Sequence, residues 1–442
     1  MSIATSPIAV ALSGGADSLA VLLGLHKTGQ PLVAVHGLFG QKLLHDFLVA
    51  CGLSSGPWPD AEHTEVLVQL EKITASLGIP LHCMDFSDTF SQKVVRPFVE
   101  QYAMGQTPNP CALCNRAIKF GALLEACMAL GASHLATGHY ARLESPACPG
   151  QTGLAGLPFA PRPQAQENPA SRGCPELPAL FPGTDKTKDQ SYFLALVPEK
   201  NLARTIFPLA LAQKAEVLQF LRSLDITPPQ PKESQEICFI PGNRSGPLPG
   251  YRDFIPFMAE RLGVPLPGPG PIRLVDSDSG TLKKKQEIGR HRGLWQYTEG
   301  QRKGLGIGWK VPLHVLAKDQ TTNTLYLGPY ECMGTASLLA GPANILVPPQ
   351  FWPKTVLVKT RYREAPRQAT VRFLTADAAK AHLSGAEPFD PAAIFLEVFF
   401  LEKEKTVAPG QLVAVYAPED MRLLAGGIIC DSGALQIVRG QR

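Results

Sequence analysis

The stretch IAVALSGGADSLAVLLGLHKTG, residues 8–29, decides the fold of the N-terminal part of the chain. It opens with a short apolar run typical of a buried strand and closes with an apolar helical segment that Gly29 stops. Two adjacent glycines, Gly14 and Gly15, form the turn between them. The stretch therefore predicts a strand, a tight turn and a helix in direct succession.

The same alternation continues through the first third of the chain. Apolar runs at 31–39, 79–86 and 132–140 predict further strands, and the segments 65–78 and 117–131 predict helices that end at glycine. Strands that alternate with helices indicate parallel βαβ units. We therefore expect an α/β fold with a doubly wound parallel sheet, whose ligands bind at the carboxyl ends of the strands.

The segments after residue 144 have a different composition and a different pattern of apolar residues. Residues 145–186 are rich in proline, glycine and alanine without a period, which predicts a mobile, disordered insertion within a first domain that spans 1–210. Residues 211–311 are assigned to a small central domain. Short alternating runs separated by turns are typical of a β-barrel, which we assign to 312–442.

The bulk composition is that of a globular protein. Of 442 residues, 45% are hydrophobic and 18% charged, and the net charge of +4 permits nucleic acid as a partner without requiring it. No apolar run approaches the length of a membrane span, and the N-terminus has no basic region typical of a signal peptide. Ten irregularly spaced cysteines indicate a reducing compartment, so we expect a cytoplasmic enzyme with no membrane partner.

The turn SGGADS, Ser13–Ser18, is a candidate anion-binding loop. Main-chain N–H groups at a helix start, with the positive end of the helix dipole, bind phosphates. The spacing is neither that of a Walker loop nor that of a dinucleotide fingerprint. It matches the pyrophosphate-binding loop of enzymes that cleave ATP to AMP and pyrophosphate, in which Asp17 would hold Mg²⁺ or orient the phosphates. The alternative is an ordinary glycine turn that leads into a helix.

A second candidate site lies in TPNPCALCN, where two prolines stiffen the approach to Cys111 and Cys114. A structural zinc site takes four ligands, and the chain has no second C-x-x-C pair. A thioredoxin-like redox pair is the other alternative, although nothing nearby favours it. Cys238 in ESQEICFIP adds a third thiol. Combined with an adenylating loop, these thiols suggest that sulfur displaces AMP from an activated substrate.

Eight stretches, in the same order, resemble the tRNA-specific 2-thiouridylase family of the PP-loop ATP pyrophosphatases. They are SGGADS, TPNPCALCNRAIKFG, ATGHYAR, TKDQSYFL, KESQEICFI, YTEGQRKGLGIG, VKTRYR and APGQLVAVY. The resemblance covers nearly the whole chain apart from the insertion. It implies an adenine nucleotide alpha hydrolase-like first domain, and a transferase that thiolates C2 of the wobble uridine, position 34 of tRNA, through an adenylated base.

The resemblance also implies site residues, with ATP and Mg²⁺ as cofactors. The nucleotide would contact Ala11, Leu12, Ser13, Gly14, Gly15, Ala16, Asp17, Ser18, His36, Gly37 and Gly138. The catalytic residues would be Asp17, Cys111, Cys114 and Cys238. The residues that contact tRNA, at its anticodon stem-loop, would be Asn109, Pro110, Cys111, His139, Lys188, Asp189, Gln190, Arg361, Tyr362 and Gln411. Alternative interpretations are a strand-end histidine for His139 and a solvated barrel charge for Arg361.

Many members of that family carry aspartate at the position of Cys111. With the additional thiol, Cys111, Cys114 and Cys238 would hold a [4Fe–4S] cluster through three irons, and the fourth iron would bind hydrosulfide. The alternative is a relay in which Cys238 carries a persulfide and Cys114 then forms a disulfide with it. We favour the cluster. The sulfur would come from a cysteine desulfurase or a sulfur-relay protein.

Other functions stay open at this point. Another adenylating pyrophosphatase, such as an ammonia-using synthetase or a sulfurtransferase for a different tRNA base, needs the first domain but explains neither Cys238 nor the barrel. A non-enzymatic RNA-binding protein would not need Asp17 between paired serines. We expect a monomer or a weak dimer.

Overall fold

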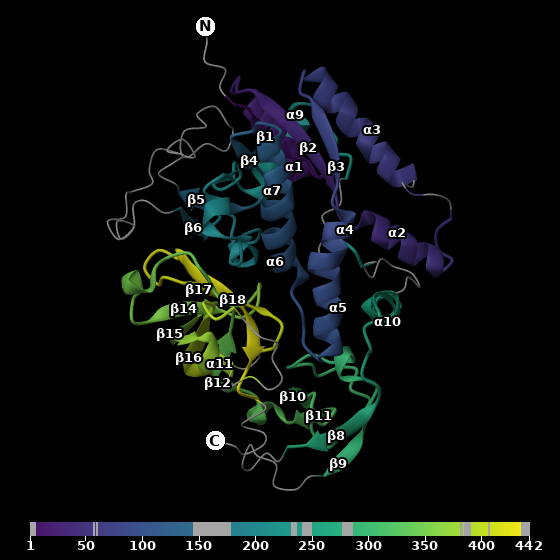
Figure 1. The fold of residues 1–442 in the computed structure, drawn as a ribbon, viewed down its shortest axis with the longest axis vertical. Helices are drawn as coiled ribbons and strands as arrows, with labels where there is room; N and C mark the ends of the chain where they lie inside the picture. The colour runs from purple at the N-terminus through teal and green to yellow at the C-terminus, as the bar shows by residue number, and fades with distance from the viewer. Residues whose placement is uncertain are drawn as a thin grey trace.

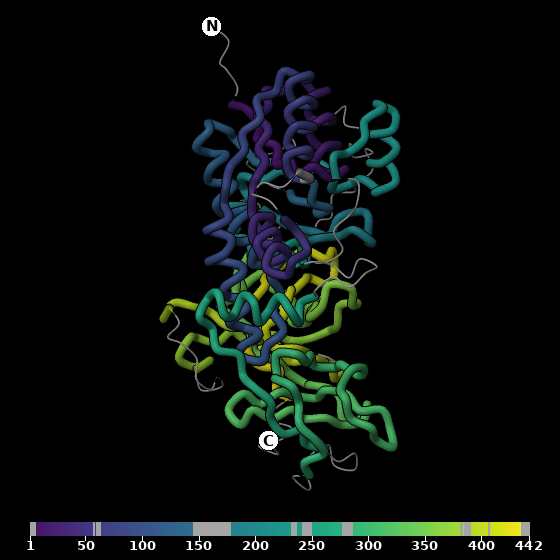
Figure 2. The backbone as a smooth tube through the Cα atoms, turned by 90° about the vertical axis from the view of Figure 1, so that its right-hand side faces the viewer, coloured from purple at the N-terminus to yellow at the C-terminus, as the bar shows by residue number. Residues whose placement is uncertain are grey.

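The structure is a computed structural model that describes residues 6–55, 58, 61–144, 178–230, 237–240, 250–275, 286–380, 383, 390–404 and 407–434. Its main parts are a five-stranded sheet, a four-stranded sheet and a barrel. Figures 1 and 2 show an elongated molecule with the five-stranded sheet near one end and the four-stranded sheet near the other. No helix in the described ranges has the length and apolarity needed to cross a membrane.

The five-stranded sheet is parallel and has the order β3-β2-β1-β4-β7. Its strands are β1 (Ile8–Ala11), β2 (Leu32–Leu38), β3 (Leu81–Asp85), β4 (His134–Ala136) and β7 (Thr205–Ile206). The helices around it are α1 (Ala16–His26), α3 (Ala61–Ser76), α7 (Leu123–Ala129) and α9 (Lys214–Ser223). The predicted α/β fold with a parallel sheet is confirmed.

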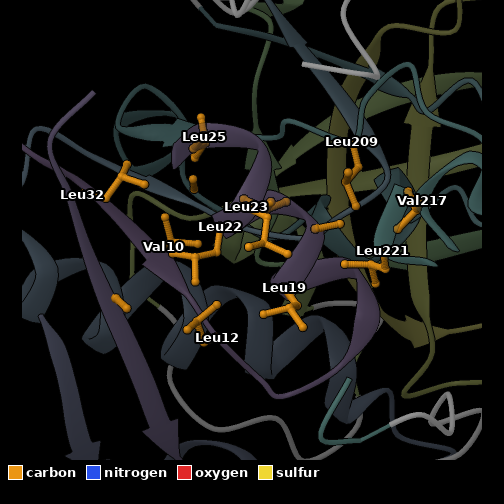
Figure 3. Close-up of a cluster of buried hydrophobic side chains, with 14 of the residues drawn as sticks. Val10, Leu12, Leu19, Leu22, Leu23, Leu25, Leu32, Leu209, Val217 and Leu221 are labelled. Carbon is orange, nitrogen blue, oxygen red and sulfur yellow. The ribbon is translucent and has the colours of Figure 1, made fainter. Parts of the chain in front are cut away.

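Both faces of this sheet are covered, because successive strand residues point to opposite sides. Val10 packs in a core with α1, α3 and α9, whereas its neighbour Ala9 packs against α7. Figure 3 shows leucines of α1 lying against Val217 and Leu221 of α9. Each such buried leucine or valine contributes about 1.5–3 kcal/mol. Packing therefore fixes the start of α9 beside the start of α1.

A helical layer extends below the sheet (Figure 1). It consists of α2 (Gln41–Ala50), α4 (Ser87–Phe90), the π-helix Ser91–Val95, α5 (Arg96–Ala103), α6 (Pro110–Cys114), the π-helix Asn115–Ala122 and α10 (Tyr251–Leu262). Its core is aromatic: Phe239 lies 5.3 Å from Phe98 and 5.7 Å from Phe254 between ring centroids. Cys114 and Ile118 belong to the same core, so the aromatic cluster holds the second cysteine and the turn that follows it.

Part of the expected insertion is regular structure. β6 (Ala179–Pro182) pairs with β5 (Ala141–Glu144) in an antiparallel ladder, and Leu180 and Phe181 are buried. The prediction of a disordered insertion is therefore wrong for 178–186, because this short apolar run finds a strand partner on the other side of the insertion. Residues 145–177 lie outside the described part. A 3-10 turn (Ser191–Leu194) and α8 (Glu199–Leu202) follow.

The four-stranded sheet has the order β10-β11-β8-β9. It contains β8 (Gly270–Leu274), β9 (Glu287–His291), β10 (His314–Asp319) and β11 (Thr324–Gly328), with a 3-10 turn at Leu294–Gln296. The strands β10 and β11 were expected in the barrel. They pair with the central strands instead, so the sheet boundary lies after Gly328 and not at residue 312.

Six antiparallel strands close the C-terminal barrel, because β12 pairs with both β16 and β18. The strands of this part are β12 (Thr335–Ala340), β13 (Asn344–Ile345), β14 (Val356–Lys359), β15 (Arg367–Thr375), β16 (Ile394–Glu404), β17 (Leu412–Tyr416) and β18 (Leu423–Asp431). Short helices lie at Tyr330–Cys332, Pro349–Phe351 and α11 (Ala376–Lys380). The predicted C-terminal β-barrel is confirmed.

Candidate active site

The loop between β1 and α1 is closed by its own hydrogen bonds. Ser13 N–H donates to Ser18 Oγ (3.2 Å), and Ser18 Oγ donates to the Gly15 carbonyl (3.0 Å). Gly14 has φ +86°, and a Cβ there would lie 3.1 Å from Val66 Cγ1. A side chain at this position would therefore be strained, which explains the first glycine of the pair. The loop is shaped before any ligand arrives.

The ends of three strands meet around this loop. His36 Nδ1, on β2, lies 2.7 Å from the Leu12 carbonyl oxygen. After β4, a Cβ on Gly138 would lie only 2.9 Å from Asp17 Cβ, so glycine permits the close approach of this strand end to α1. The residues predicted to contact the nucleotide, from Ala11 to Ser18 with His36, Gly37 and Gly138, thus gather at the carboxyl edge of the sheet.

His36 is buried beside the loop, with 2% of its surface exposed. Burial lowers its pKa, so the imidazole is neutral at pH 7. Its Nε2 atom has no hydrogen-bond partner among the described residues, while its ring lies 5.6 Å from that of His63. A neutral ring with a spare nitrogen is suited to recognition of an uncharged heterocycle.

Asp17 has two partners that the sequence did not reveal. Lys214 Nζ donates to both carboxylate oxygens, at 2.7 and 2.9 Å, and the Tyr140 hydroxyl donates to Oδ1 at 2.8 Å. Lys214 lies 197 residues further along the chain, in a segment that shows only the pattern of an ordinary helix. Tyr140 directly follows Gly138 and His139 in the stretch ATGHYAR. Its position next to these expected site residues is the signal that could have identified it as a site residue.

The cysteine loop is fixed by a helix cap. Asn109 Oδ1 accepts a hydrogen bond from Ala112 N–H (3.2 Å), and Pro110 occupies the first helical position of α6. Asn109 is itself buried. Cys111 is exposed, whereas Cys114, one turn further, is buried. The predicted base-contacting residues thus lie at the start of a short helix, and its two cysteines differ in exposure.

All three thiols are shifted toward their protonated forms. Burial raises the pKa of Cys114 to about 12. Desolvation by the surrounding protein also raises the pKa of Cys238 to about 11 and that of Cys111, although part of each of these two residues is exposed to solvent. Cys111 and Cys238 raise the pKa of Cys114 further. Ile237 and Phe239, on either side of Cys238, pack in the same core as Cys114, so the two cysteine segments are neighbours. The positive charge of Lys119 opposes each shift. Lys119 lies in the cysteine stretch TPNPCALCNRAIKFG, and the sequence did not single it out as a site residue.

The cysteines do not form a metal site in this arrangement. Within the ranges that the structure describes, no group of three His, Cys, Asp or Glu side chains could hold a metal ion. The described residues include Cys111, Cys114 and Cys238. The three-thiolate arrangement that a cluster requires is therefore not present here, and the [4Fe–4S] site stays a prediction.

Three residues expected to contact tRNA join the barrel to the rest of the molecule. Gln411 Nε2 donates to the carbonyls of Thr107 (2.9 Å) and Pro108 (3.2 Å). Arg361 Nη2 donates to the Glu299 carbonyl (3.0 Å), and the Tyr362 ring lies 4.6 Å from that of Phe193. Their contact with tRNA is untested and stays a prediction.

The other expected tRNA residues lie near the strand ends. His139 is only 7% exposed, and its ring lies between those of Phe120 (5.3 Å) and Phe207 (5.9 Å). Gln190 is bound to the main chain of Tyr140 through both its own backbone N–H and its side chain. Asp189 accepts from Ser191, and Lys188 is half-buried. Contact between these residues and tRNA also stays a prediction.

The family described as tRNA methyl transferase HUP domain matches residues 6–242, and the one described as tRNA methyl transferase PRC-barrel domain matches residues 257–329. The chain is 40% identical over 423 residues to the tRNA-specific 2-thiouridylase MnmA of Nitratidesulfovibrio vulgaris strain Miyazaki F, a match that covers 96% of this chain and 98% of that protein. The chain belongs to the tRNA-specific 2-thiouridylase family. It is a tRNA sulfurtransferase that uses ATP through a PP-loop.

Other 2-thiouridylases are similar over the same extent. The proteins of the same name from Oleidesulfovibrio alaskensis and Lawsonia intracellularis are 40% and 34% identical, and each match covers 96% of this chain and 98% of the relative. A solved U34-tRNA thiolase NcsA from Methanococcus maripaludis, with its [4Fe-4S] cluster, is 15% identical over 58% of this chain and 65% of that chain, with a TM-score of 0.28. That likeness is too weak to support an inference about this 2-thiouridylase.

Proposed function

We propose that this 2-thiouridylase modifies uridine 34 in two steps. The O2 atom of the base attacks the α-phosphorus of ATP, and pyrophosphate leaves. A sulfur nucleophile then attacks C2, and AMP leaves. In the first step the loop Ser13–Ser18 would hold the phosphates with its N–H groups, while Mg²⁺ on Asp17 would neutralise their charge.

The observation that carries this proposal is the packing of the helix after Cys114 against the strand end after β4. The ring of His139, the neighbour of Gly138 at the nucleotide edge, lies 5.3 Å from that of Phe120, which belongs to the π-helix Asn115–Ala122. The charge of Lys119, in the same π-helix, lowers the pKa of His139 in addition to the main effect of burial. The same charge lowers the pKa values of Cys111, Cys114 and Cys238 against the effect of burial. One side chain thus lies within electrostatic range of both the nucleotide edge and the sulfur chemistry. A base held between them would meet both reactants.

For the second step we propose that the thiols deliver the sulfur. A donor such as a cysteine desulfurase or a relay protein leaves a persulfide on Cys238, whose outer sulfur attacks C2. Cys114 Sγ then attacks Cys238 Sγ, a disulfide forms between them, and the sulfur stays on the base with the electron pair. Two thiols are oxidised as the sulfane sulfur is reduced, and an external thiol restores the pair. No step is assigned to an iron–sulfur cluster.

We propose that the chain has three domains, namely the nucleotide domain, a central domain and the barrel, and that they bind tRNA together. The barrel and the strand ends would contact the anticodon stem-loop through Lys188, Asp189, Gln190, His139, Arg361, Tyr362 and Gln411. Wobble uridine must leave the base stack to reach the loop Asn109–Cys111. Phosphate contacts would make the affinity fall with salt.

The test is a single-turnover reaction of the purified chain with ATP, a persulfide donor and an unmodified tRNA transcript. We expect release of pyrophosphate that depends on a uridine at position 34, together with 2-thiouridine in the digested product. Pyrophosphate without thiolation would favour another adenylating enzyme, and neither product would contradict the proposal. A transcript with cytidine at position 34 is the matched control.

A further inference from the structure

An ion pair sits at the mouth of the phosphate-binding loop. Lys214 Nζ lies 2.7 Å from Asp17 Oδ1 and 2.9 Å from Oδ2. The lysine side chain is 14% exposed and the aspartate side chain 30%. Asp17 lies in the first turn of α1, where main-chain N–H groups and the helix dipole attract anions. The ammonium group is therefore placed where the phosphates of ATP are expected.

The main chain of Lys214 is held rigidly in this position. Its N–H donates to Asp185 Oδ2 (3.0 Å), and Gln213 N–H donates to Glu216 Oε2 (2.8 Å) in a capping box. One turn further, Val217 packs into the core formed by α1 (Figure 3). The helix start is thus fixed relative to the loop. The long side chain can change partners without movement of the backbone.

Bound nucleotide would change which cation the Asp17 carboxylate contacts. In the proposed function this carboxylate receives Mg²⁺, a hard cation that prefers carboxylate and phosphate oxygens. Both carboxylate oxygens here accept hydrogen bonds from Lys214, so the metal and the lysine compete for the same atoms. A displaced ammonium next to a polyphosphate finds a second set of anionic acceptors.

We propose that Lys214 is a substrate-binding residue that exchanges partners during the reaction. Without nucleotide it holds the Asp17 carboxylate. With ATP it donates to a phosphate oxygen and stabilises the charge that develops as pyrophosphate leaves. This inference rests on the proposed function, because it gives Lys214 a role in the adenylation step. The competing explanation is a purely structural ion pair that only neutralises Asp17.

The two explanations predict different affinities of the full-length protein for inorganic pyrophosphate in the absence of Mg²⁺. Calorimetry measures this affinity. In Asp17→Asn the lysine is released from its anionic partner, and we expect pyrophosphate to bind more tightly than to the parent chain. Adding Lys214→Met to Asp17→Asn should weaken binding by about 10- to 100-fold, the range for a hydrogen bond between charged groups. Lys214→Arg should retain much of the parent affinity.

If the double variant binds pyrophosphate within about threefold of Asp17→Asn, the lysine does not contact phosphate and the inference is wrong. Arg222→Ala, an exposed change at the other end of the same helix, is the matched control and should bind like the parent. Thermal unfolding of each variant reports whether it folds. Because the measurement uses no tRNA, a failure of thiolation in the parent chain would leave the lysine result intact, and the two failures are distinguishable.

Discussion

Lys318 Nζ and Glu299 Oε2 lie 3.3 Å apart, and both side chains are almost completely buried, at 2% and 6% exposure. Lys318 also donates to the Tyr297 carbonyl (2.8 Å) and lies 3.5 Å from Thr107 Oγ1. The pair thus connects β10 of the central sheet with the residue that precedes the cysteine loop. Burial lowers the pKa of Lys318 and raises that of Glu299, which is the desolvation cost of burying the pair, and the attraction between the two groups opposes both shifts.

Glu299→Ala should lower the free energy of unfolding by about 3–5 kcal/mol, because it leaves the Lys318 charge buried without its anionic partner. The double variant Glu299→Leu with Lys318→Met should be much closer to the parent, since no buried charge remains. Urea denaturation followed by tryptophan fluorescence measures both. Equal losses in the single and double variants would contradict this account.

Cys114→Ala and Cys238→Ala should each abolish thiolation while the release of pyrophosphate continues, because in the proposed order adenylation precedes sulfur transfer. Single-turnover assays that follow both products test this separation. Cys51→Ala is the matched control, since Cys51 is exposed at the end of α2. Loss of pyrophosphate release in the two active-site variants would show that the thiols act before the base is activated.

Iron content decides between the two routes for sulfur. If the cluster prediction is correct, anaerobically purified protein should contain about four irons, absorb near 400 nm and lose both in Cys111→Ala. If the thiol relay operates, iron should be absent after reconstitution, and Cys111→Ala should retain thiolation.

His139 should make the folded state sensitive to acid. Burial holds its pKa well below the ordinary value of 6.5, so the folded protein keeps the ring neutral while the unfolded chain takes up a proton below that pH. The free energy of unfolding is therefore unaffected by this ring above pH 6.5. Below that pH it decreases as the pH falls, because only the unfolded chain binds the proton. Relative to His139→Leu, the parent should lose about 1.4 kcal/mol per pH unit below pH 6.5.

Urea titrations of the parent and His139→Leu at pH 7.5, 6.5 and 5.5 measure that difference. A difference that stays constant with pH would show that His139 has the same pKa in the folded and unfolded states, which would contradict this account. Thiolation assays on the same variant also report whether His139 contributes to tRNA binding, as the sequence predicted.

Local patterns predicted the parts of the fold that depend on neighbouring residues. The apolar run before Gly14 and the helical segment after Gly15 are contiguous, and the structure places β1 and α1 there. The strand Ala179–Pro182 was missed because its partner, Ala141–Glu144, lies across the insertion. The strands β10 and β11 look like any barrel hairpin, and only their pairing with β8 assigns them to the central sheet.

In the candidate site, too, the sequence predicted the residues that lie in local motifs and missed those that come from distant segments. The motifs of the sequence supplied the loop residues Ser13–Ser18 and the three cysteines, and the roles of these residues stay predictions. Lys214 was missed because nothing in an amphipathic helix indicates that its first residue reaches an aspartate 197 positions earlier. Long-range polar contacts of this kind depend on tertiary packing, and the local spacing of apolar residues in the sequence does not indicate them.

The contact between Gln411 and Thr107 joins residues 304 positions apart. A Cβ on Gly410 would lie 2.9 Å from the same Thr107 carbonyl oxygen, so the barrel and the cysteine loop fit closely. During synthesis, the nucleotide domain emerges from the ribosome long before these partners exist. A nascent or truncated chain that ends before the barrel keeps the Asn109 cap but lacks the Gln411 hydrogen bonds to this loop. We therefore expect sulfur transfer to tRNA to be impaired in a chain whose synthesis stops before the barrel.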